Sequence, residues 1–308
     1  ISIGLVGSEM CIRDRLERLG ASFAKLIVWL VISFVSIFSV VLLAEEKKAV
    51  ELNLLVYNTH GLPTIFARDK PRWRFPKIIE LAHAYDVSLF QEDFAHHDLI
   101  QTHAHEALLI SRGENAAVAK CPVCSGSGLT FLSSLTEFGW QVSTSFEPFE
   151  TCSGWLNKAN DCFAQKGFQI IDLISTEGDR LVLVNTHMDA GRSEFDRVAR
   201  AAQLDQLIRS IENRITVEAL IVAGDLNLDW DNTQDRELLF DFRDRLGLAR
   251  AVNGKQSQRG WTVLDYIFYR SGTQTNLTVL ESGEDVNFVS GALSLSDHPA
   301  LFARFSIY

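Results

Sequence analysis

Oxygen donors and histidines stand at the ends of several short apolar runs in this 308-residue chain. They fall in the segments YNTH, QED, VNTHMD, GDLN and SDHP, each next to a run rich in Val, Ile, Leu or Phe. The residues concerned are Asn58, His60, Glu92, Asn185, His187, Asp189, Asp225, Asn227, Asp297 and His298. Because rigid strands commonly carry polar groups to one rim of a sheet in α/β folds, the pattern predicts a site at such a rim.

Side chains of these types suit a hard divalent cation. Asn, Asp and Glu bind Mg²⁺, Mn²⁺ or Ca²⁺ through oxygen, whereas zinc favours Cys and His. We therefore expect Mg²⁺ as the cofactor, with Mn²⁺ or Ca²⁺ as alternatives. One histidine near the ion can take the proton of an attacking water, and a second can act as an acid or as a hydrogen-bond donor to the developing oxyanion. The residue types alone therefore predict phosphoester hydrolysis.

The apolar runs themselves predict strands. They are short and rich in β-branched and aromatic residues, which favours strands over helices. The predicted strands cover residues 52–57, 87–90, 168–174, 181–184, 219–223, 263–269 and 300–305.

A helix is predicted between these strands, most clearly over residues 193–213. Ser193 and Asp196 resemble a capping box at its start. Its apolar residues at helical spacing are Phe195, Val198, Ala202, Ile208 and Ile211. Strands alternating with helices indicate a mixed α/β domain.

Length and composition predict one large domain behind an N-terminal leader. Hydrophobic residues make up 47% of the chain, and no repeat or low-complexity linker follows residue 44, so we expect residues 50–308 to form one domain. Residues 1–25 are a basic leader, of which 7–15 look like translated sequencing adapter. Residues 26–44 are apolar and long enough for a signal peptide or a transmembrane anchor. A buried core helix is the alternative for that segment.

The charges around the apolar segment predict export. Arg18 and Lys25 precede it, and Glu45 and Glu46 follow it. The positive-inside rule then leaves the N-terminus in the cytoplasm and places the following domain outside. We expect an extracytoplasmic protein that is secreted, periplasmic or membrane-anchored, and monomeric.

Four cysteines fit an oxidising compartment. Setting Cys11 aside, we favour the pairs Cys152–Cys162 and Cys121–Cys124 among three possible pairings, because each pair closes a short loop. A zinc site is the rival, since Cys-x-x-Cys is a common half-site. The second half does not match, because Cys152 and Cys162 are too far apart for a zinc knuckle.

The formal net charge of −10 argues against a polyanionic substrate unless a local basic patch or a bound cation overrides it. A nuclease would need basic residues grouped at the rim, such as Arg68, Arg72 and Arg74.

Two further clusters are interpreted as structural. The histidines at 96, 97, 103 and 105 could form a metal tract, but a solvated surface is the preferred interpretation. Residues 126–128, Gly-Ser-Gly, could approach a phosphate, but a plain loop is preferred.

The motifs, taken in order, resemble a known superfamily. The series YNTHG, FQED, VNTHMD, AGDLN, LDYIF and LSDHP is similar to the six motif blocks of the endonuclease/exonuclease/phosphatase superfamily. That superfamily contains deoxyribonuclease I, abasic endonucleases, inositol polyphosphate phosphatases and bacterial neutral sphingomyelinases. The resemblance covers residues 52–305 and implies an α/β fold: a four-layered sandwich of two packed mixed β-sheets flanked by helices, with the site at one rim.

The resemblance also implies a metal site. Asn58 and Glu92 would hold the ion, with Glu92 as the direct carboxylate ligand, and Asp297 would complete the metal or hydrogen-bonding shell. His60 and Asp189 do not fall on positions that the family uses consistently. We interpret them as structural loop residues.

The catalytic roles that the resemblance implies fall on five residues. His298 would be the general base, oriented by Asp265, whose carboxylate can fix the tautomer of the ring. Asp225 and Asn227 would position the nucleophile and the phosphoryl oxygen. His187 would stabilise or protonate the leaving group from the opposite side.

One segment bears on the substrate. DCFAQKGFQIIDL, residues 161–173, resembles the sphingomyelinase branch and predicts a phospholipid substrate of a sphingomyelinase or phospholipase C type. The first alternative is an exported nuclease similar to deoxyribonuclease I. The second is an inactive membrane-anchored binding protein, which would lack Glu92, Asp225 or His298, and all three are present.

Overall fold

The computed structural model describes residues 49–63, 70–114, 126–154, 161–252 and 262–308. Two six-stranded mixed sheets dominate this part of the chain. The first contains, in spatial order, β11 (Leu277–Glu284), β14 (Leu301–Ile307), β1 (Val50–Asn58), β2 (Val87–Gln91), β4 (Thr130–Ser133) and β3 (Leu109–Arg112). The second contains β5 (Gln141–Pro148), β6 (Gly167–Ile174), β7 (Arg180–His187), β8 (Ala219–Asp225), β10 (Asp265–Arg270) and β9 (Ala249–Arg250).

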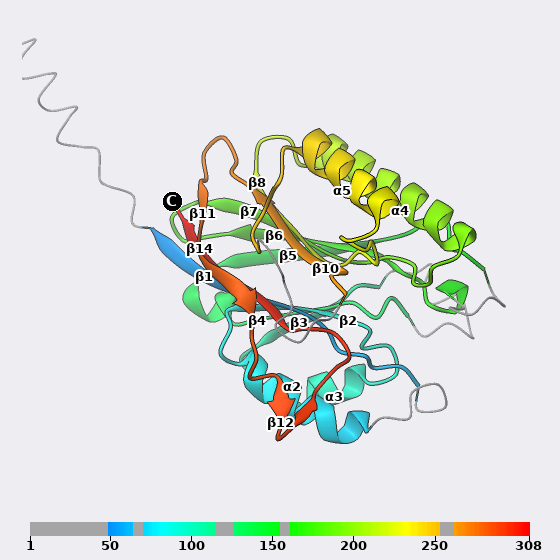
Figure 1. Ribbon diagram of the computed structural model, residues 1–308. Helices are drawn as coiled ribbons and strands as arrows, with labels where there is room; N and C mark the ends of the chain where they lie inside the picture. Colours follow the sequence, from blue (N-terminus) through cyan, green and yellow to red (C-terminus); the bar gives the residue numbers. More distant parts are fainter. Residues whose placement is uncertain (1–48, 64–69, 115–125, 155–160, 253–261) are drawn as a thin grey trace, which may run out of the picture. The chain divides into compact units, whose positions relative to one another are not determined.

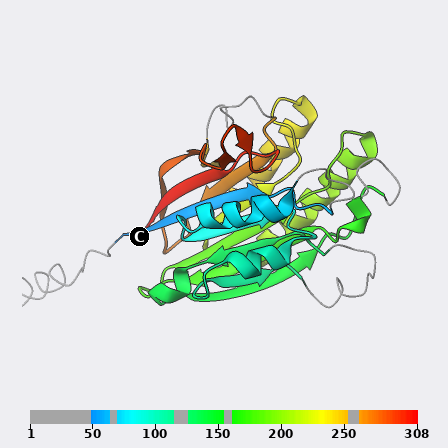
Figure 2. The same cartoon turned by 90° about the horizontal axis from the view of Figure 1, so that it is seen from below.

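Helices cover the outer face of each sheet, so the domain has four layers (Figure 1). The helices are α2 (Pro71–Ala82), α3 (His97–His103), α4 (Glu194–Arg214) and α5 (Thr233–Leu246), with short 3₁₀ turns η2 (Leu135–Phe138) and η3 (Asp161–Phe163). A small hairpin pairs β12 (Val289–Ser290) with β13 (Leu293–Ser294). Figure 2 looks onto α2 and α3, which lie across the first sheet.

Three apolar clusters hold the layers together. The inner faces of both sheets share one core, in which Leu54 and Phe305 pack with Leu183. A second cluster joins α4 and α5 to the second sheet, and a third joins α2 and α3 to the first. The predicted four-layered sandwich is therefore confirmed.

Strand pairing brings distant parts of the sequence to one rim. In the first sheet β1 runs parallel to β2, which places Asn58 opposite Gln91, the residue before Glu92. In the second sheet β7 runs parallel to β8 and β8 antiparallel to β10. That register puts His187 and Asp265 on either side of Asp225.

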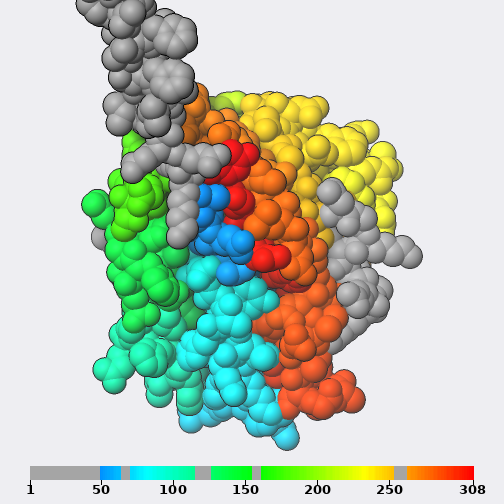
Figure 3. All heavy atoms as spheres, turned by 90° about the vertical axis from the view of Figure 1, so that its left-hand side faces the viewer, coloured from blue at the N-terminus to red at the C-terminus, as the bar shows by residue number. Residues whose placement is uncertain are grey.

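The opposite rim carries both ends of the domain. Val50 at the start of β1 pairs with Ile307 at the end of β14, and Figure 3 shows these two segments side by side on that face. Strand polarity thus separates the chain ends from the rim that collects the polar side chains.

All seven predicted strands are present, within a few residues of their expected ends. Helix α4 is also confirmed, with Ser193 as its N-cap and the expected capping box with Asp196. The predicted apolar face of α4 is wrong in part, because Phe195 is 77% and Val198 60% exposed. At about 100° per residue these positions lie opposite Leu207 and Ile211, which pack on the sheet.

Replacing Ser193 by alanine should lower the free energy of unfolding by about 1 kcal/mol, the usual cost of losing an N-cap side chain. The Ser193 hydroxyl accepts from the Asp196 N–H and donates to the Asp196 carboxylate. Denaturant titration at neutral pH measures the change, with exposed Ser145→Ala on β5 as the control.

The same cap predicts a pH dependence. Burial opposes the charged Asp196 carboxylate, but hydrogen bonds from Ser193 outweigh it and lower the pKa of Asp196. A lowered carboxylate pKa stabilises the fold above the unfolded value of about 3.9, and this is lost as pH falls through the folded pKa. The Ser193→Ala difference should therefore shrink in acid. A difference that stays constant into strong acid would contradict this account of the cap.

The predicted leader and apolar segment, residues 1–25 and 26–44, lie outside the described residues. Within the described ranges, no helix has the length and apolar character that a bilayer crossing requires.

Candidate active site

Three non-glycine residues with left-handed backbone lie at the rim where β1, β2 and β8 end. They are His60, Glu92 and Asn227, with φ of 49°, 59° and 52°. Such conformations cost on the order of 1–3 kcal/mol each and cluster at functional sites. The rim therefore stores backbone strain where the predicted site residues meet.

A group of buried polar side chains forms the centre of the site. The Asn58 amide Nδ2 donates to Glu92 Oε1 and to Asp225 Oδ2, both at 3.0 Å. His187 Nε2 lies 3.5 Å from Glu92 Oε1 and 3.7 Å from Asp225 Oδ2. Glu92, His187 and Asp225 each offer one ligand atom, all within 4.8 Å of one another, so these three could hold a metal ion.

The electrostatics of this cluster fit a cation. Burial is the largest cause that raises the pKa of Glu92, and the neighbouring Asp225 contributes. Burial, followed by the charge of Asp265, raises the pKa of Asp225 to about 6. Buried carboxylates that resist ionisation are stabilised in their charged form by a positive ion. The oxygen-rich donor set therefore suits Mg²⁺.

His298 and Asp265 form a dyad beside the cluster. His298 Nδ1 lies 2.8 Å from Asp265 Oδ2, and His298 Nε2 lies 3.8 Å from Asp225 Oδ2. Burial opposes the imidazolium, but the charges of Asp265 and Asp225 and the Asp265 hydrogen bond together outweigh it and raise the pKa of His298 to about 11. The carboxylates thus favour the protonated ring and fix its orientation, and a cation bound beside Asp225 would oppose that charge and favour the neutral ring that can act as a base.

His187 has the opposite character. Its side chain is buried, and burial, then the charges of Lys166 and His298, hold the pKa of His187 well below its usual value. His187 is therefore neutral at physiological pH. A neutral imidazole can stabilise an oxyanion through a hydrogen bond, whereas proton donation from an imidazolium is unfavourable here.

Asn227 is buried in the site, whereas Asp297 and His60 lie at its outer edge. The Asn227 N–H donates to Asp225 Oδ1 at 2.8 Å, and its Nδ2 donates to the Met188 carbonyl at 3.1 Å. Asp297 stands on the outer edge with 59% of its side chain exposed, 3.3 Å from His60 Nδ1. His60 Nδ1 is also 3.8 Å from Glu92 Oε2, so His60 belongs to the edge of the site.

Sequence reasoning missed the part played by Lys166. Lys166 Nζ lies 3.2 Å from His187 Nε2, donates to the Met188 carbonyl at 2.8 Å and pairs with Asp161 Oδ1 at 2.7 Å. Burial opposes its charge, but Asp161 and Asp189 outweigh this and raise the pKa of Lys166. A buried fixed cation thus stands behind His187. The available sequence signal was the position of Lys166 within residues 161–173, the segment that resembles the sphingomyelinase branch.

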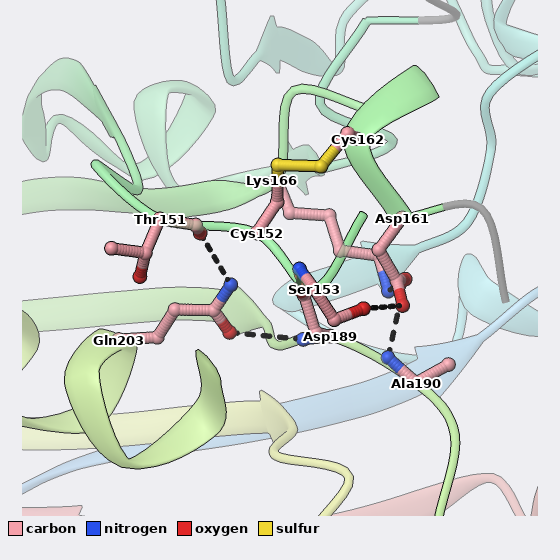
Figure 4. The surroundings of a disulfide bond; sticks show 9 residues. All are labelled: Thr151, Cys152, Ser153, Asp161, Cys162, Lys166, Asp189, Ala190 and Gln203. Atoms are coloured by element: carbon pink, nitrogen blue, oxygen red, sulfur yellow. Dashed lines mark hydrogen bonds and ion pairs between the residues drawn. A yellow bond between two sulfur atoms is a disulfide. The ribbon is translucent and has the colours of Figure 1, made fainter. Parts of the chain in front are cut away.

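A disulfide holds this corner together (Figure 4). Cys152 pairs with Cys162 as predicted, and Cys121 and Cys124 lie outside the described residues. Ser153, next to the bridge, donates through its N–H to Asp189 Oδ2 at 2.6 Å and through its hydroxyl to Asp161 Oδ2 at 3.4 Å. Asp189 is thus a buried structural residue.

Replacing Cys152 and Cys162 together by alanine should lower the free energy of unfolding by roughly 3 kcal/mol, the loop-entropy value for a bridge across 10 residues. Denaturant titration of the oxidised chain and of the double variant measures the loss, after peptide mapping without reduction has verified the link. Identical unfolding midpoints would show that the bridge contributes nothing.

The structure bears on the two clusters that were interpreted as structural, the histidines between residues 96 and 105 and the segment 126–128. The solvated-surface interpretation is wrong for His97, which is buried with Nδ1 2.6 Å from Asp93 Oδ2 and 3.0 Å from the Thr130 hydroxyl. It holds for His103 and His105, which are exposed. The Gly-Ser-Gly segment is a structural loop: Gly128 has φ of 71°, and a Cβ there would meet the Phe94 ring at 2.4 Å.

Two packed mixed sheets flanked by helices, with carboxylates and histidines at one rim, define the fold of the endonuclease/exonuclease/phosphatase superfamily, as the motif blocks predict. No protein-family model and no curated protein sequence matches the chain.

Solved structures do match, at low sequence identity. Beta toxin from Staphylococcus aureus is 18% identical with a TM-score of 0.60, over 83% of this chain and 99% of that chain. Sphingomyelinase C from Streptomyces griseocarneus is 20% identical with a TM-score of 0.58, over the same shares. TDP2 from D. rerio, complexed with a single-strand DNA product, is 15% identical with a TM-score of 0.58, over 83% and 98%. Likeness at this level establishes the fold.

Proposed function

We propose that this chain is a Mg²⁺-dependent phosphodiesterase that hydrolyses its substrate by in-line attack of water. One observation carries the proposal: the Asp265–His298 dyad faces the buried carboxylate of Asp225, which shares a cluster with Glu92. A dyad of this kind accepts a proton from water, and buried carboxylates bind a hard cation. Both groups serve the hydrolysis of a phosphodiester by direct attack of water.

Glu92 and Asn58 are the residues that would hold Mg²⁺, Glu92 as the direct carboxylate ligand and Asn58 through the hydrogen bonds of its amide to Glu92 and Asp225. Asp297 would complete the shell from the exposed edge. When bound, the ion supplies positive charge to the phosphoryl oxygens and the leaving oxygen. A beta toxin structure from Staphylococcus aureus, 17% identical with a TM-score of 0.61, contains bound magnesium ions, which supports the choice of ion.

Side chains of the protein accept the proton of the attacking water and stabilise the negative charge that develops on the leaving oxygen. His298 takes the proton of the attacking water at Nε2, while Asp265 holds Nδ1. Asp225 positions the nucleophile, and the Asn227 N–H fixes the Asp225 carboxylate. Neutral His187 stabilises the departing oxygen, with the charge of Lys166 behind it.

A phospholipid diester of the sphingomyelin or phosphatidylcholine type is the proposed substrate class. The resemblance of residues 161–173 to sphingomyelinases, the formal net charge of −10 and the similarity to a sphingomyelinase C structure support it. We also propose that residues 50–308 act as a monomeric catalytic domain outside the cytoplasm. The Cys152–Cys162 bridge supports this location, because disulfides persist in oxidising compartments.

A DNA substrate is the second candidate, because the chain has the same fold as TDP2 in complex with single-strand DNA product. A DNA substrate would need basic side chains exposed at the rim. Arg74 does not provide one, because it is buried and its guanidinium donates to backbone carbonyls. Arg68 lies outside the described residues, and Arg72 is exposed.

The substrate is tested by offering sphingomyelin, phosphatidylcholine, supercoiled DNA and an inositol phosphate to the purified full chain with Mg²⁺. Phosphocholine release that EDTA abolishes is the expected result. DNA nicking with the same metal dependence would replace the lipid substrate by DNA. Inactivity on all four substrates in the presence of Mg²⁺ would favour an inactive binding protein.

A further inference from the structure

Arg74 on α2 is buried, and its guanidinium is directed at backbone carbonyls of two loops. Nη1 donates to the Thr59 carbonyl at 2.8 Å and to the Leu295 carbonyl at 2.5 Å, and Nη2 donates to the His60 carbonyl at 2.8 Å. Only 5% of the residue is exposed. One side chain from α2 thus joins the loop after β1 to the segment at Leu295, which lies 221 residues from Arg74 in the sequence.

The two loops are those that carry the metal-binding and proton-accepting groups. Thr59 and His60 directly follow Asn58 at the end of β1, and Leu295 directly precedes the loop of Ser296 and His298. The Ser296 hydroxyl joins the same loops, since it donates to the Asn58 carbonyl at 2.7 Å and accepts from the His298 N–H at 3.3 Å.

Arg74 also holds the strained residue in the first loop. His60 has φ of 49°. Its N–H donates to Asn58 Oδ1 at 3.0 Å, and its carbonyl accepts from Arg74. A conformation of this kind persists only where its surroundings fix it. Losing the bond to its carbonyl would let the His60 backbone relax and would turn the Asn58 side chain that is bonded to it.

We propose that Arg74 is a positioning residue of the phosphodiesterase site. Through the Thr59, His60 and Leu295 carbonyls it sets the placement of Asn58 relative to His298, without touching the substrate. The inference rests on the function proposed above. A guanidinium is a rigid fork of five N–H donors, so lysine, a point charge with three rotatable donors, cannot restore the geometry.

Arg270 offers a matched control. It is half-buried on β10, and its guanidinium also donates to backbone carbonyls, those of Leu246 at 3.2 Å and Ile215 at 2.6 Å. It lies at the end of β10 away from the site, because Asp265 at the start of that strand is the residue paired with Asp225. Replacing Arg270 removes similar bonds without touching either site loop.

The test compares Arg74→Met and Arg74→Lys with Arg270→Met and Arg270→Lys in the full chain. Unfolding by denaturant, Mg²⁺ binding by calorimetry, and kcat and KM on the active substrate are measured for each. We expect lowered stability in both Met variants. Only the Arg74 variants should weaken Mg²⁺ binding and lower kcat, by about 10² for Met and about 10-fold for Lys, with KM changed little, since small displacements of catalytic groups cost about this much.

Unchanged Mg²⁺ affinity and kcat in Arg74→Met would overturn the proposal, as would equal losses in the Arg270 variants. If Arg74→Met does not fold, Arg74→Lys decides, and wild-type affinity and kcat there would also overturn it. An unaltered chain that hydrolyses no phosphodiester would refute the proposed function instead, while weakened Mg²⁺ binding confined to the Arg74 variants would still support the positioning role.

Discussion

Replacing His298 by alanine should lower the turnover of phosphodiester hydrolysis by at least about 10², the usual scale for losing a general base. The imidazole is the group that accepts the proton of the attacking water, and its orientation depends on the 2.8 Å contact with Asp265. Circular dichroism and steady-state kinetics on the purified variant measure fold and rate. His103→Ala, an exposed histidine at the end of α3, is the control and should be fully active.

Asp265→Asn separates the base from its orienting partner. His298 acts as a base only without its proton, so kcat/KM should rise with pH through the pKa of His298. Asp265 helps to raise that pKa, so removing its charge should move the rising limb to lower pH. Near-normal turnover in His298→Ala, or a limb that moves to higher pH in Asp265→Asn, would contradict the assignment of the base.

Replacing Glu92 by glutamine should weaken Mg²⁺ binding and turnover by at least about 10², because even groups that only support a metal ligand cost 10- to 100-fold when lost. The free energy of unfolding of the metal-free protein should instead be higher in Glu92→Gln than in the unaltered chain. Burial raises the pKa of Glu92, so the ionised carboxylate destabilises the fold as pH rises above the unfolded value of about 4.3. A neutral amide lacks that penalty.

Calorimetry with Mg²⁺ and denaturant titration in EDTA measure the two effects on one sample. Exposed Glu106→Gln is the matched control and should change neither. Opposite signs for metal affinity and metal-free stability are the expected combination, since functional sites often cost stability. Wild-type Mg²⁺ affinity in Glu92→Gln would remove Glu92 from the metal site, and lowered stability in EDTA would show that the carboxylate is structural.

The sequence predicted those parts of the fold in which local pattern and burial agree. Strands that are buried on both faces, such as β8, are continuous apolar runs in the sequence, and this pattern predicted them. Strand β5 was not, because most of its residues are exposed or half-exposed and its apolar content is low. Helix α2 was also not predicted, because Pro76 lies inside it and proline disfavours a helix interior. The N-terminal register of α4 was misjudged because two opposite faces both carry apolar residues.

The site was predicted to the level of residue types at strand ends. Asn58, Glu92, His187, Asp225, Asp265 and His298 meet at one rim because strand polarity brings them there. The contacts of Lys166 with His187 and of Arg74 with Leu295 could not be predicted, since each depends on how layers pack and not on sequence neighbours. The outward direction of Asp297 likewise follows from the loop that carries it.

The most direct test is phosphodiester hydrolysis by the purified full chain, measured first with Mg²⁺, then after EDTA, and again after Mg²⁺ is restored. The account predicts hydrolysis that chelation abolishes, that Mg²⁺ restores, and that is lost in His298→Ala. Hydrolysis that persists in EDTA, or no hydrolysis of any phosphodiester by protein with bound Mg²⁺, would contradict it.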